Sequence, residues 1–251
     1  MFKTILLSRA GPKARIALNR PRAGNRVNPS MTEELAQAAE FINQDDSTRV
    51  VTLTGQGQSF SSGWERIRFD SAEELARHRA AGAIARIQKP VVAAINGDAI
   101  GQGLELALAA DIRIAVATAH FGMPQVRFGV LPWDGGTQRL PRLVGRAHAL
   151  ALLLTGAVID ASEALRIGLV HQVVEPQQLE AATDSAVEQI ASTAPVAERY
   201  AKETVMKGMD MTLEQGLHLE ADLNILLHTT GDRAEGIRSF RERRPPKFSG
   251  Q

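Results

Sequence analysis

The sequence predicts an α/β protein with a buried sheet, followed by a mostly helical C-terminal third. Short apolar segments at residues 50–54, 91–95 and 112–116 are rich in β-branched residues, which indicates strands. They alternate with segments of helical character, as is typical of a sheet covered by helices on both faces. Beyond residue 140 strand signals become sparse while helix starts recur. We therefore expect one α/β body with a helical C-terminal region.

The other expected elements follow from turn and capping signals. Residues 2–8 and 14–19 flank the Gly11-Pro12 turn and predict an N-terminal hairpin. Ser30 and Glu33 form a capping box, which predicts that a helix follows. A short strand is expected over residues 170–174, and further helices over residues 71–86 and 104–110 and from Asp160, Pro176, Pro195 and Thr212.

Composition limits the classes of function. The 251 residues carry 29 Lys and Arg against 28 Asp and Glu, a net charge of +1, so no bulk attraction to nucleic acid or to an acidic membrane surface is expected. There is no cysteine, which excludes disulfides, thiolate nucleophiles and cysteine-ligated metals. The six histidines are scattered without a His-x-x-x-His pair, so we expect no metal site.

The distribution of apolar residues bears on location. No segment approaches the ~20 consecutive apolar residues of a membrane helix. The apolar run at the N-terminus is too short for a signal peptide and soon meets Arg9 and Lys13. The expected location is therefore the cytoplasm, without a membrane partner.

Residues 94–111 carry the most informative pattern. A buried strand runs into a glycine turn at residues 97–103, and this turn opens a helix. Such a turn leaves unpaired N–H groups at the positive end of the helix dipole, which can bind a phosphate or stabilise an oxyanion. Glu105 stands alone among the Leu and Ala residues of this helix. Because a buried carboxylate is costly unless it is paired or catalytic, both a structural and a catalytic role stay open.

A second glycine turn at residues 59–65 follows the strand at 50–54 in the same manner. Taken alone it is an ordinary loop. Two strand-end turns that each offer an N–H are what a two-donor oxyanion hole requires. Neither turn has the GxGxxG spacing of a dinucleotide-binding fold, so no redox cofactor is expected.

The chain also resembles the crotonase superfamily, the enoyl-CoA hydratases and isomerases. VTLTGQGQSFSSGWE is similar to its first motif and KPVVAAINGDAIGQGLELALAADIRIA to its second. The segment from FGMPQ to HQVV and both termini are similar as well, so the resemblance covers essentially the whole chain. It implies a crotonase-like spiral of repeated ββα units over residues 1–195 and a helical region over 196–251. The resemblance also implies that this region builds homotrimers, often paired into hexamers.

The resemblance further implies a site for a coenzyme A thioester. The thioester carbonyl lies between two backbone N–H groups, which by position belong to Trp64 and Gln102, and the family usually has glycine where Gln102 stands. Glu105 falls on the first of the two glutamates of hydratases, the one that holds and activates water. The second glutamate falls on Gln125. An amide orients water or substrate by hydrogen bonds but exchanges no proton.

Asp134 is the candidate to replace the missing carboxylate. In dienoyl-CoA isomerases, ring-opening isomerases and a hydrolytic dehalogenase of the superfamily, an acidic residue on this loop does chemistry. It stands there one position earlier, where this chain has Trp133. The alternative is that Asp134 caps the turn before Gly135-Gly136.

Further residues are expected in the acyl pocket or beside coenzyme A. Trp64 and Trp133 are the only tryptophans and either line a pocket for a flat or cyclic acyl group or pack beneath the coenzyme A arm. Arg66 and Gly101 belong to the expected pocket, whereas His78 is expected on a helix surface. The resemblance places six residues near the nucleotide: Arg22, Gly24, Arg26, Ser62, Phe240 and Lys247. Phe240 and Lys247 come either from the same chain or from a neighbouring subunit. For each basic residue the alternative is a solvated charge on the surface.

The leading hypothesis is an enoyl-CoA hydratase-like lyase acting on an α,β-unsaturated acyl-CoA, alicyclic or dienoyl in view of the two tryptophans. Glu105 activates water, the Trp64 and Gln102 N–H groups hold the oxyanion, and Asp134 completes proton transfer. The alternatives are a double-bond isomerase, a thioester hydrolase or dehalogenase using Glu105 and Asp134, and a non-catalytic acyl-CoA or RNA binder. No cofactor is expected, because coenzyme A is part of the substrate.

Overall fold

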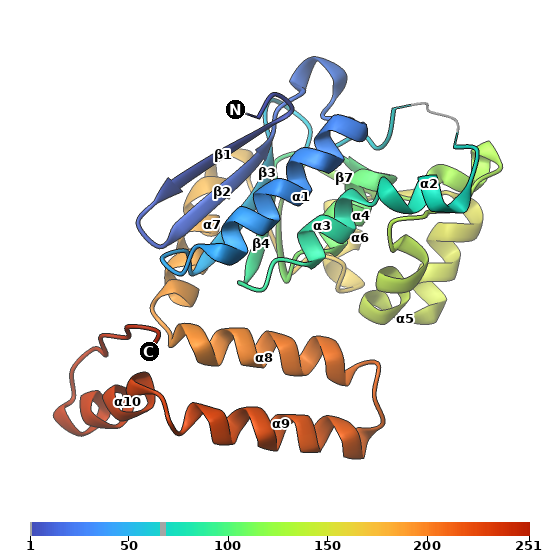
Figure 1. The fold of residues 1–251 in the computed structure, drawn as a ribbon. Coiled ribbons are helices and arrows are strands. Elements are labelled where there is room, and N and C mark those ends of the chain that lie inside the picture. Colours follow the sequence, from blue (N-terminus) through green and yellow to red (C-terminus); the bar gives the residue numbers. More distant parts are fainter. Residues whose placement is uncertain (1, 66–68) are drawn as a thin grey trace.

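The computed structural model describes residues 2–65 and 69–251, and its centre is a six-stranded sheet in the order β1-β2-β3-β4-β6-β9 (Figure 1). β1 and β2 form an antiparallel hairpin, and each later pair of neighbours is parallel. Parallel strands end at the same edge of a sheet, so the turns after β3 and β4 are brought together. The strands are β1 (Ile5–Ala10), β2 (Lys13–Leu18), β3 (Val50–Gly55), β4 (Val91–Ile95), β6 (Ile112–Val116) and β9 (Gln172–Val174).

A second, three-stranded sheet stands at that edge. It consists of β5 (Ala99–Ile100), β7 (His120–Gly122) and β8 (Val158–Asp160) in the order β5-β7-β8. β5 is parallel to β7, and β7 is antiparallel to β8. β5 lies inside the glycine turn that the sequence predicted, so this turn is held by strand pairing.

Helices cover the body, and a layer of three helices lies beside it (Figure 1). α7 packs on β3, β4 and β6, whereas α1 packs against α3 and the β1–β2 hairpin. In residues 2–65 and 69–251 no helix has both the length and the apolar character needed to cross a membrane. The body contains α1 (Pro29–Gln44), α2 (Ala72–Arg77), α3 (Ala80–Ala85), α4 (Gln102–Leu108), α5 (Gly136–Thr155), α6 (Ala161–Arg166), α7 (Leu179–Ala191) and the short 3-10 helices η1 (Pro21–Ala23), η2 (Pro124–Phe128) and η3 (Pro176–Gln178).

The C-terminal layer consists of α8 (Pro195–Gly208), α9 (Leu213–Leu227) and α10 (Gly231–Glu242). It is fastened to the sheet by Lys202, whose Nζ lies 2.7 Å from an Asp111 carboxylate oxygen and donates to the Lys89 carbonyl at 3.0 Å. The division expected at residue 195 falls at the first residue of α8.

Several expected boundaries differ from the structure. The cap of α1 is Asn28, whose side chain accepts the Met31 N–H at 2.9 Å, and not Ser30. Pro29 at the first helical position favours this earlier start. The helix expected over residues 71–86 is broken into α2 and α3. The first strand begins at Ile5, three residues later than expected.

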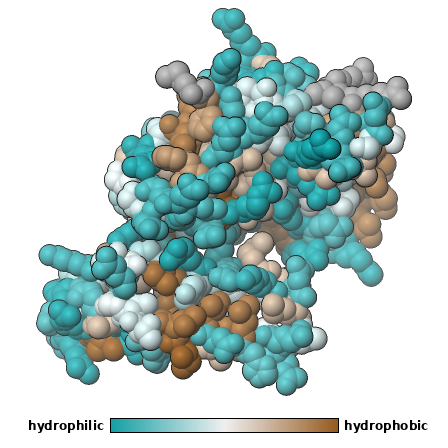
Figure 2. Space-filling model, in the orientation of Figure 1, coloured by the Kyte–Doolittle hydropathy of each residue, from teal (hydrophilic) through white to brown (hydrophobic). Residues whose placement is uncertain are grey.

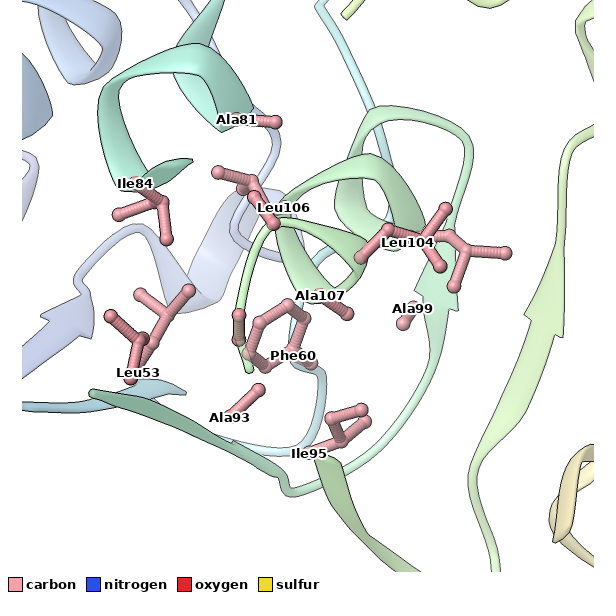
Figure 3. Packing of buried hydrophobic residues seen from close by; sticks show 14 of the residues in the cluster. Leu53, Phe60, Ala81, Ile84, Ala93, Ile95, Ala99, Leu104, Leu106 and Ala107 are labelled. Carbon is pink, nitrogen blue, oxygen red and sulfur yellow. The ribbon is translucent and has the colours of Figure 1, made fainter. Parts of the chain in front are cut away.

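The hydrophobic core surrounds α4. Figure 3 shows Phe60 packed between the sheet residues Ala93 and Ile95 and the α4 residue Ala107. All residues of α4 are buried, and Phe60 is fully buried. A helix enclosed on all sides cannot shift without opening the core, so its side chains have fixed positions.

Candidate active site

The two predicted glycine turns meet at the start of α4. The Ile100 N–H donates to the Ser61 carbonyl and the Ser61 N–H to the Asp98 carbonyl, both at 3.0 Å. Gly63 and Gly101 have positive φ angles of 106° and 56°, which favours glycine at both positions. A Cβ at Gly63 would lie 3.2 Å from the Ile100 carbonyl oxygen and 3.9 Å from the Gln102 nitrogen.

These turns present the N–H groups of Trp64 and Gln102. Gln102 is the first residue of α4, so its N–H has no partner within the helix. In the part of the chain that the structure describes, neither N–H donates to an acceptor. Two free donors on adjoining turns can stabilise negative charge on one carbonyl oxygen.

Glu105 lies in the first turn of α4 and has no exposed surface. Its Oε1 accepts the Asp134 N–H at 2.7 Å and the Gly136 N–H at 2.8 Å. Its Oε2 is buried and has no partner among the described residues. The carboxylate is thus anchored through one oxygen while the other is available for a ligand.

Burial raises the pKa of Glu105 to about 7, and the nearby Asp134 charge acts in the same direction. The two N–H groups and Arg139 oppose this shift. A carboxyl group with a pKa near neutrality can both accept and return a proton.

The Asp134 side chain is buried and occupied on both oxygens. Oδ2 accepts the Ala81 N–H at 2.6 Å and Gln102 Nε2 at 3.0 Å, and Oδ1 accepts the Gly82 N–H at 3.0 Å. Burial raises the pKa of this carboxyl. Asp134 therefore caps the start of α3, where sequence reasoning had considered the turn before Gly135-Gly136.

Gln125 lies in η2 and is buried. A Cβ on Gly101 would lie 3.5 Å from Gln125 Nε2, so this amide borders the turn that leads into α4. Neither its Nε2 nor its Oε1 has a partner within the described chain. Buried amides are rarely unpaired, so both atoms are free for a ligand or water.

Four aromatic rings gather beside these groups. Trp64 lies 5.7 Å from Phe69, 5.8 Å from His78 and 5.8 Å from Trp133, measured between ring centroids. Both indole Nε1 atoms are buried without a partner in residues 2–65 and 69–251. Sequence reasoning missed Phe69, which belongs to no motif, and placed His78 on a surface, whereas its ring joins this cluster. Arg66 lies outside the described residues.

The expected coenzyme A residues form two groups. The Ser62 N–H and Oγ donate to the Gly24 carbonyl at 2.9 and 3.1 Å, beside the exposed Arg22 and Arg26. Phe240 lies in α10, at the opposite end of the molecule from the loop before α1 (Figure 1), and Lys247 follows that helix in the chain. One chain therefore does not bring the two groups together.

The sequence profile of the enoyl-CoA hydratase/isomerase family matches residues 12–251. The chain belongs to this family. The (E)-benzylidenesuccinyl-CoA hydratase of Thauera aromatica is 41% identical over 94% of this chain and 95% of its own length, and the crotonyl-CoA hydratase of Syntrophomonas wolfei is 38% identical over 98% of both.

The expected fold is confirmed as well. The crystal structure of an enoyl-CoA hydratase from Bacillus anthracis matches with a TM-score of 0.95 and 37% identity, covering 99% of this chain and 100% of the other. The family and its fold thus agree with the resemblance carried by the two motifs.

The burial of Glu105 predicts a pH-dependent stability. Its pKa is raised from 4.5 to about 7, so the folded protein binds one more proton than the unfolded chain between these values. Stability is then lost as the pH rises through this window, by about 3 kcal/mol at about 1.4 kcal/mol per unit. Glu105→Gln removes this loss. The free energy of unfolding of the variant, measured in urea at fixed protein concentration, should therefore rise relative to that of wild type as the pH increases from 4 to 8. The control Glu33→Gln, at an exposed glutamate, should show the same pH dependence as wild type. A plot of unfolding free energy against pH for Glu105→Gln that runs parallel to wild type contradicts the prediction.

Proposed function

We propose that this protein adds water reversibly to an α,β-unsaturated acyl-CoA thioester, with Glu105 as the one carboxylate that exchanges protons. The observation that carries this proposal is a fully buried carboxylate whose Oε2 has no partner among the described residues, in the helix that begins with Gln102. Within the same residues the backbone N–H groups of Gln102 and Trp64 have no acceptor either. Membership of the enoyl-CoA hydratase/isomerase family supports it.

In the proposed reaction, the thioester oxygen accepts the N–H groups of Trp64 and Gln102. These donors stabilise the enolate that forms when water attacks the β carbon, and one such donor typically contributes about 3–4 kcal/mol. No cofactor is required, because the donors and one carboxylate supply the chemistry.

Glu105 then acts twice. As the water oxygen bonds to the β carbon, Glu105 Oε2 takes one water proton, and the carbonyl oxygen takes the electron pair of the double bond as the enolate. The enolate then collapses, and the α carbon receives a proton from Glu105. The carboxylate is regenerated, and H and OH have been added. Gln125 orients the water without exchanging a proton.

The occupied oxygens of Asp134 favour this single-carboxylate scheme over the alternatives that need a second acid. Three N–H donors from the protein itself already bind its carboxylate, with at least one on each oxygen. An isomerase, hydrolase or dehalogenase working through Asp134 is therefore less well supported.

For the acyl group, we propose a flat cyclic or aromatic substituent. The support is the cluster of Trp64, Phe69, His78 and Trp133 beside the proposed oxyanion hole. A 41% identical relative is named for an aromatic substrate, benzylidenesuccinyl-CoA. Aromatic rings recognise such groups by stacking and edge contacts.

We also propose that the protein forms a homotrimer, alone or paired as a hexamer. Neither α8 nor α9 has a buried residue, and Figure 2 shows hydrophobic surface over the C-terminal layer. Exposed apolar patches of this kind mark association surfaces. A neighbouring copy could bring Phe240 and Lys247 to the Gly24–Ser62 region. The exposed apolar side chains of these helices include Val205, Met206, Leu213, Leu217, Ile225 and Leu226.

Hydration is tested by mass spectrometry in H₂¹⁸O with crotonyl-CoA, cinnamoyl-CoA and cyclic enoyl-CoAs. Wild type is expected to yield a mass-plus-water product that contains ¹⁸O. Glu105→Gln should lower kcat/KM by 10²–10⁴-fold, the usual contribution of a general acid–base, while Glu33→Gln retains activity. A shifted double bond or free coenzyme A without added water would support the isomerase or hydrolase instead, and binding without turnover the acyl-CoA binder.

The acyl pocket is tested with Trp133→Ala. Removal of the ring should reduce kcat/KM for cinnamoyl-CoA relative to crotonyl-CoA by 10-fold or more, since pocket contacts discriminate by about 1–3 kcal/mol. Trp133→Phe should restore part of the preference. Equal losses for both substrates would show that Trp133 does not select the acyl group.

Self-association is tested by light scattering on the eluting protein. We expect three or six times the 27.1 kDa chain mass. Leu213→Glu, at a side chain that is 80% exposed, should lower this mass by placing a charge in the interface. A monomer at micromolar concentration would contradict the proposal.

A further inference from the structure

We infer that the side chains of Asp134 and Gln102 form a positioning clamp. It holds the Glu105 carboxylate in a fixed position relative to the turn that presents the Gln102 N–H. The clamp is the Gln102 Nε2–Asp134 Oδ2 hydrogen bond together with the bonds from Asp134 to the start of α3. The inference rests on the proposed function in taking Glu105 as the catalytic group. It assigns Asp134 a role other than proton transfer.

The Asp134 carboxylate joins three elements. It comes from the loop before α5, accepts two backbone N–H groups at the start of α3, and accepts the side-chain amide of the first residue of α4. Its own carbonyl accepts Arg139 Nη1 at 2.7 Å, which ties the loop to α5. These four bonds restrict rotation of the backbone at Asp134.

That peptide is one of the two that hold Glu105. The Asp134 N–H donates to Glu105 Oε1 at 2.7 Å, so the same residue is fixed by its side chain and fixes the carboxylate by its backbone. Loss of the side-chain bonds would let the loop and Glu105 move together. A catalytic group displaced by 1 Å can lose about 10²-fold in rate.

Gln102 connects the clamp to the oxyanion hole. Its backbone N–H is one proposed oxyanion donor, and its side chain donates to Asp134 Oδ2 at 3.0 Å and to the His78 carbonyl at 3.2 Å. The side chain is 1% exposed, so these bonds form away from solvent. A glycine at this position would keep the backbone donor and lose both tethers.

The clamp also places a negative charge near Glu105. Burial raises the pKa of Asp134, and the three N–H donors that face its carboxylate oppose this shift. A like charge nearby makes ionisation of Glu105 less favourable. Charged or titratable groups near this pair include Arg139 of α5, Arg79 and Arg86 flanking α3, and His78 at the end of α2.

Two variants separate the charge from the tether. Asp134→Asn removes the charge, keeps the size of the side chain and can still accept from Ala81 and Gln102 through one oxygen. Gln102→Met keeps a side chain of similar length and the Asp134 charge but removes the donor. If Asp134 only caps α3, Asp134→Asn would lower stability, and Gln102→Met would change neither stability nor activity.

The experiment is a ¹³C NMR titration of glutamate-labelled protein, in which Glu105→Gln identifies the Glu105 carboxyl signal. In wild type its midpoint is expected near pH 7. Asp134→Asn should lower the midpoint by about one pH unit, whereas Gln102→Met should leave it within a few tenths. This readout needs no substrate, so failure of the proposed reaction would not be mistaken for failure of the clamp.

The second readout is turnover of the acyl-CoA that wild type hydrates. Gln102→Met should lower kcat by about 10-fold with KM changed by less than twofold. In the double variant that carries both Asp134→Asn and Gln102→Met, the loss of transition-state stabilisation should not exceed the sum of the losses in the two single variants. Unchanged kcat in Gln102→Met, or an unmoved Glu105 midpoint in Asp134→Asn, overturns the clamp. If only Asp134→Asn abolishes turnover, Asp134 is a proton donor. Melting temperatures confirm that each variant is folded.

Discussion

The rest of the site depends on the burial of one carboxylate in an apolar helix. Glu105 has no solvent contact, and the free energy needed to bury it is partly offset by the two N–H groups of Asp134 and Gly136. The Asp134 donor lies on the loop before α5 and the Gly136 donor at the first residue of that helix, so the loop itself must be held. Packing around α4 fixes the carboxylate from one side, and the bonds of Asp134 fix the loop from the other.

The sheet makes this arrangement possible by bringing two strand ends together. The turns after β3 and β4 approach so closely that a Cβ at Gly103 would lie 2.1 Å from the Ser61 carbonyl oxygen. Such contact is available only to glycine, and it aligns the Trp64 and Gln102 N–H groups on adjoining turns. The donors are therefore set by backbone packing, which explains why a glutamine side chain can stand at Gln102 without loss of the N–H.

Sequence reasoning identified Glu105 and the two turns because both have local signals: an isolated charge in an apolar helix, and glycines after β-branched strands. It could not find the partners of Asp134, since α3 lies some fifty residues earlier in the chain and no local pattern records that contact. His78 and Phe69 were missed for the same reason. The cap of α1 is Asn28 and not Ser30, because Pro29 between them favours the first helical position.

Three polar side chains near the proposed reaction centre differ in how many of their hydrogen bonds are satisfied. Among the residues that the structure describes, Asp134 accepts bonds on both oxygens, Glu105 has one oxygen without a partner, and both polar atoms of the Gln125 amide lack one. A carboxylate that already accepts bonds on both oxygens serves best as a support, since protonation would weaken those charge-assisted bonds. A free amide can hold water in one orientation, and a half-free carboxylate can take and return its proton. The proposed division of roles therefore follows from bonding capacity, without requiring a second catalytic acid.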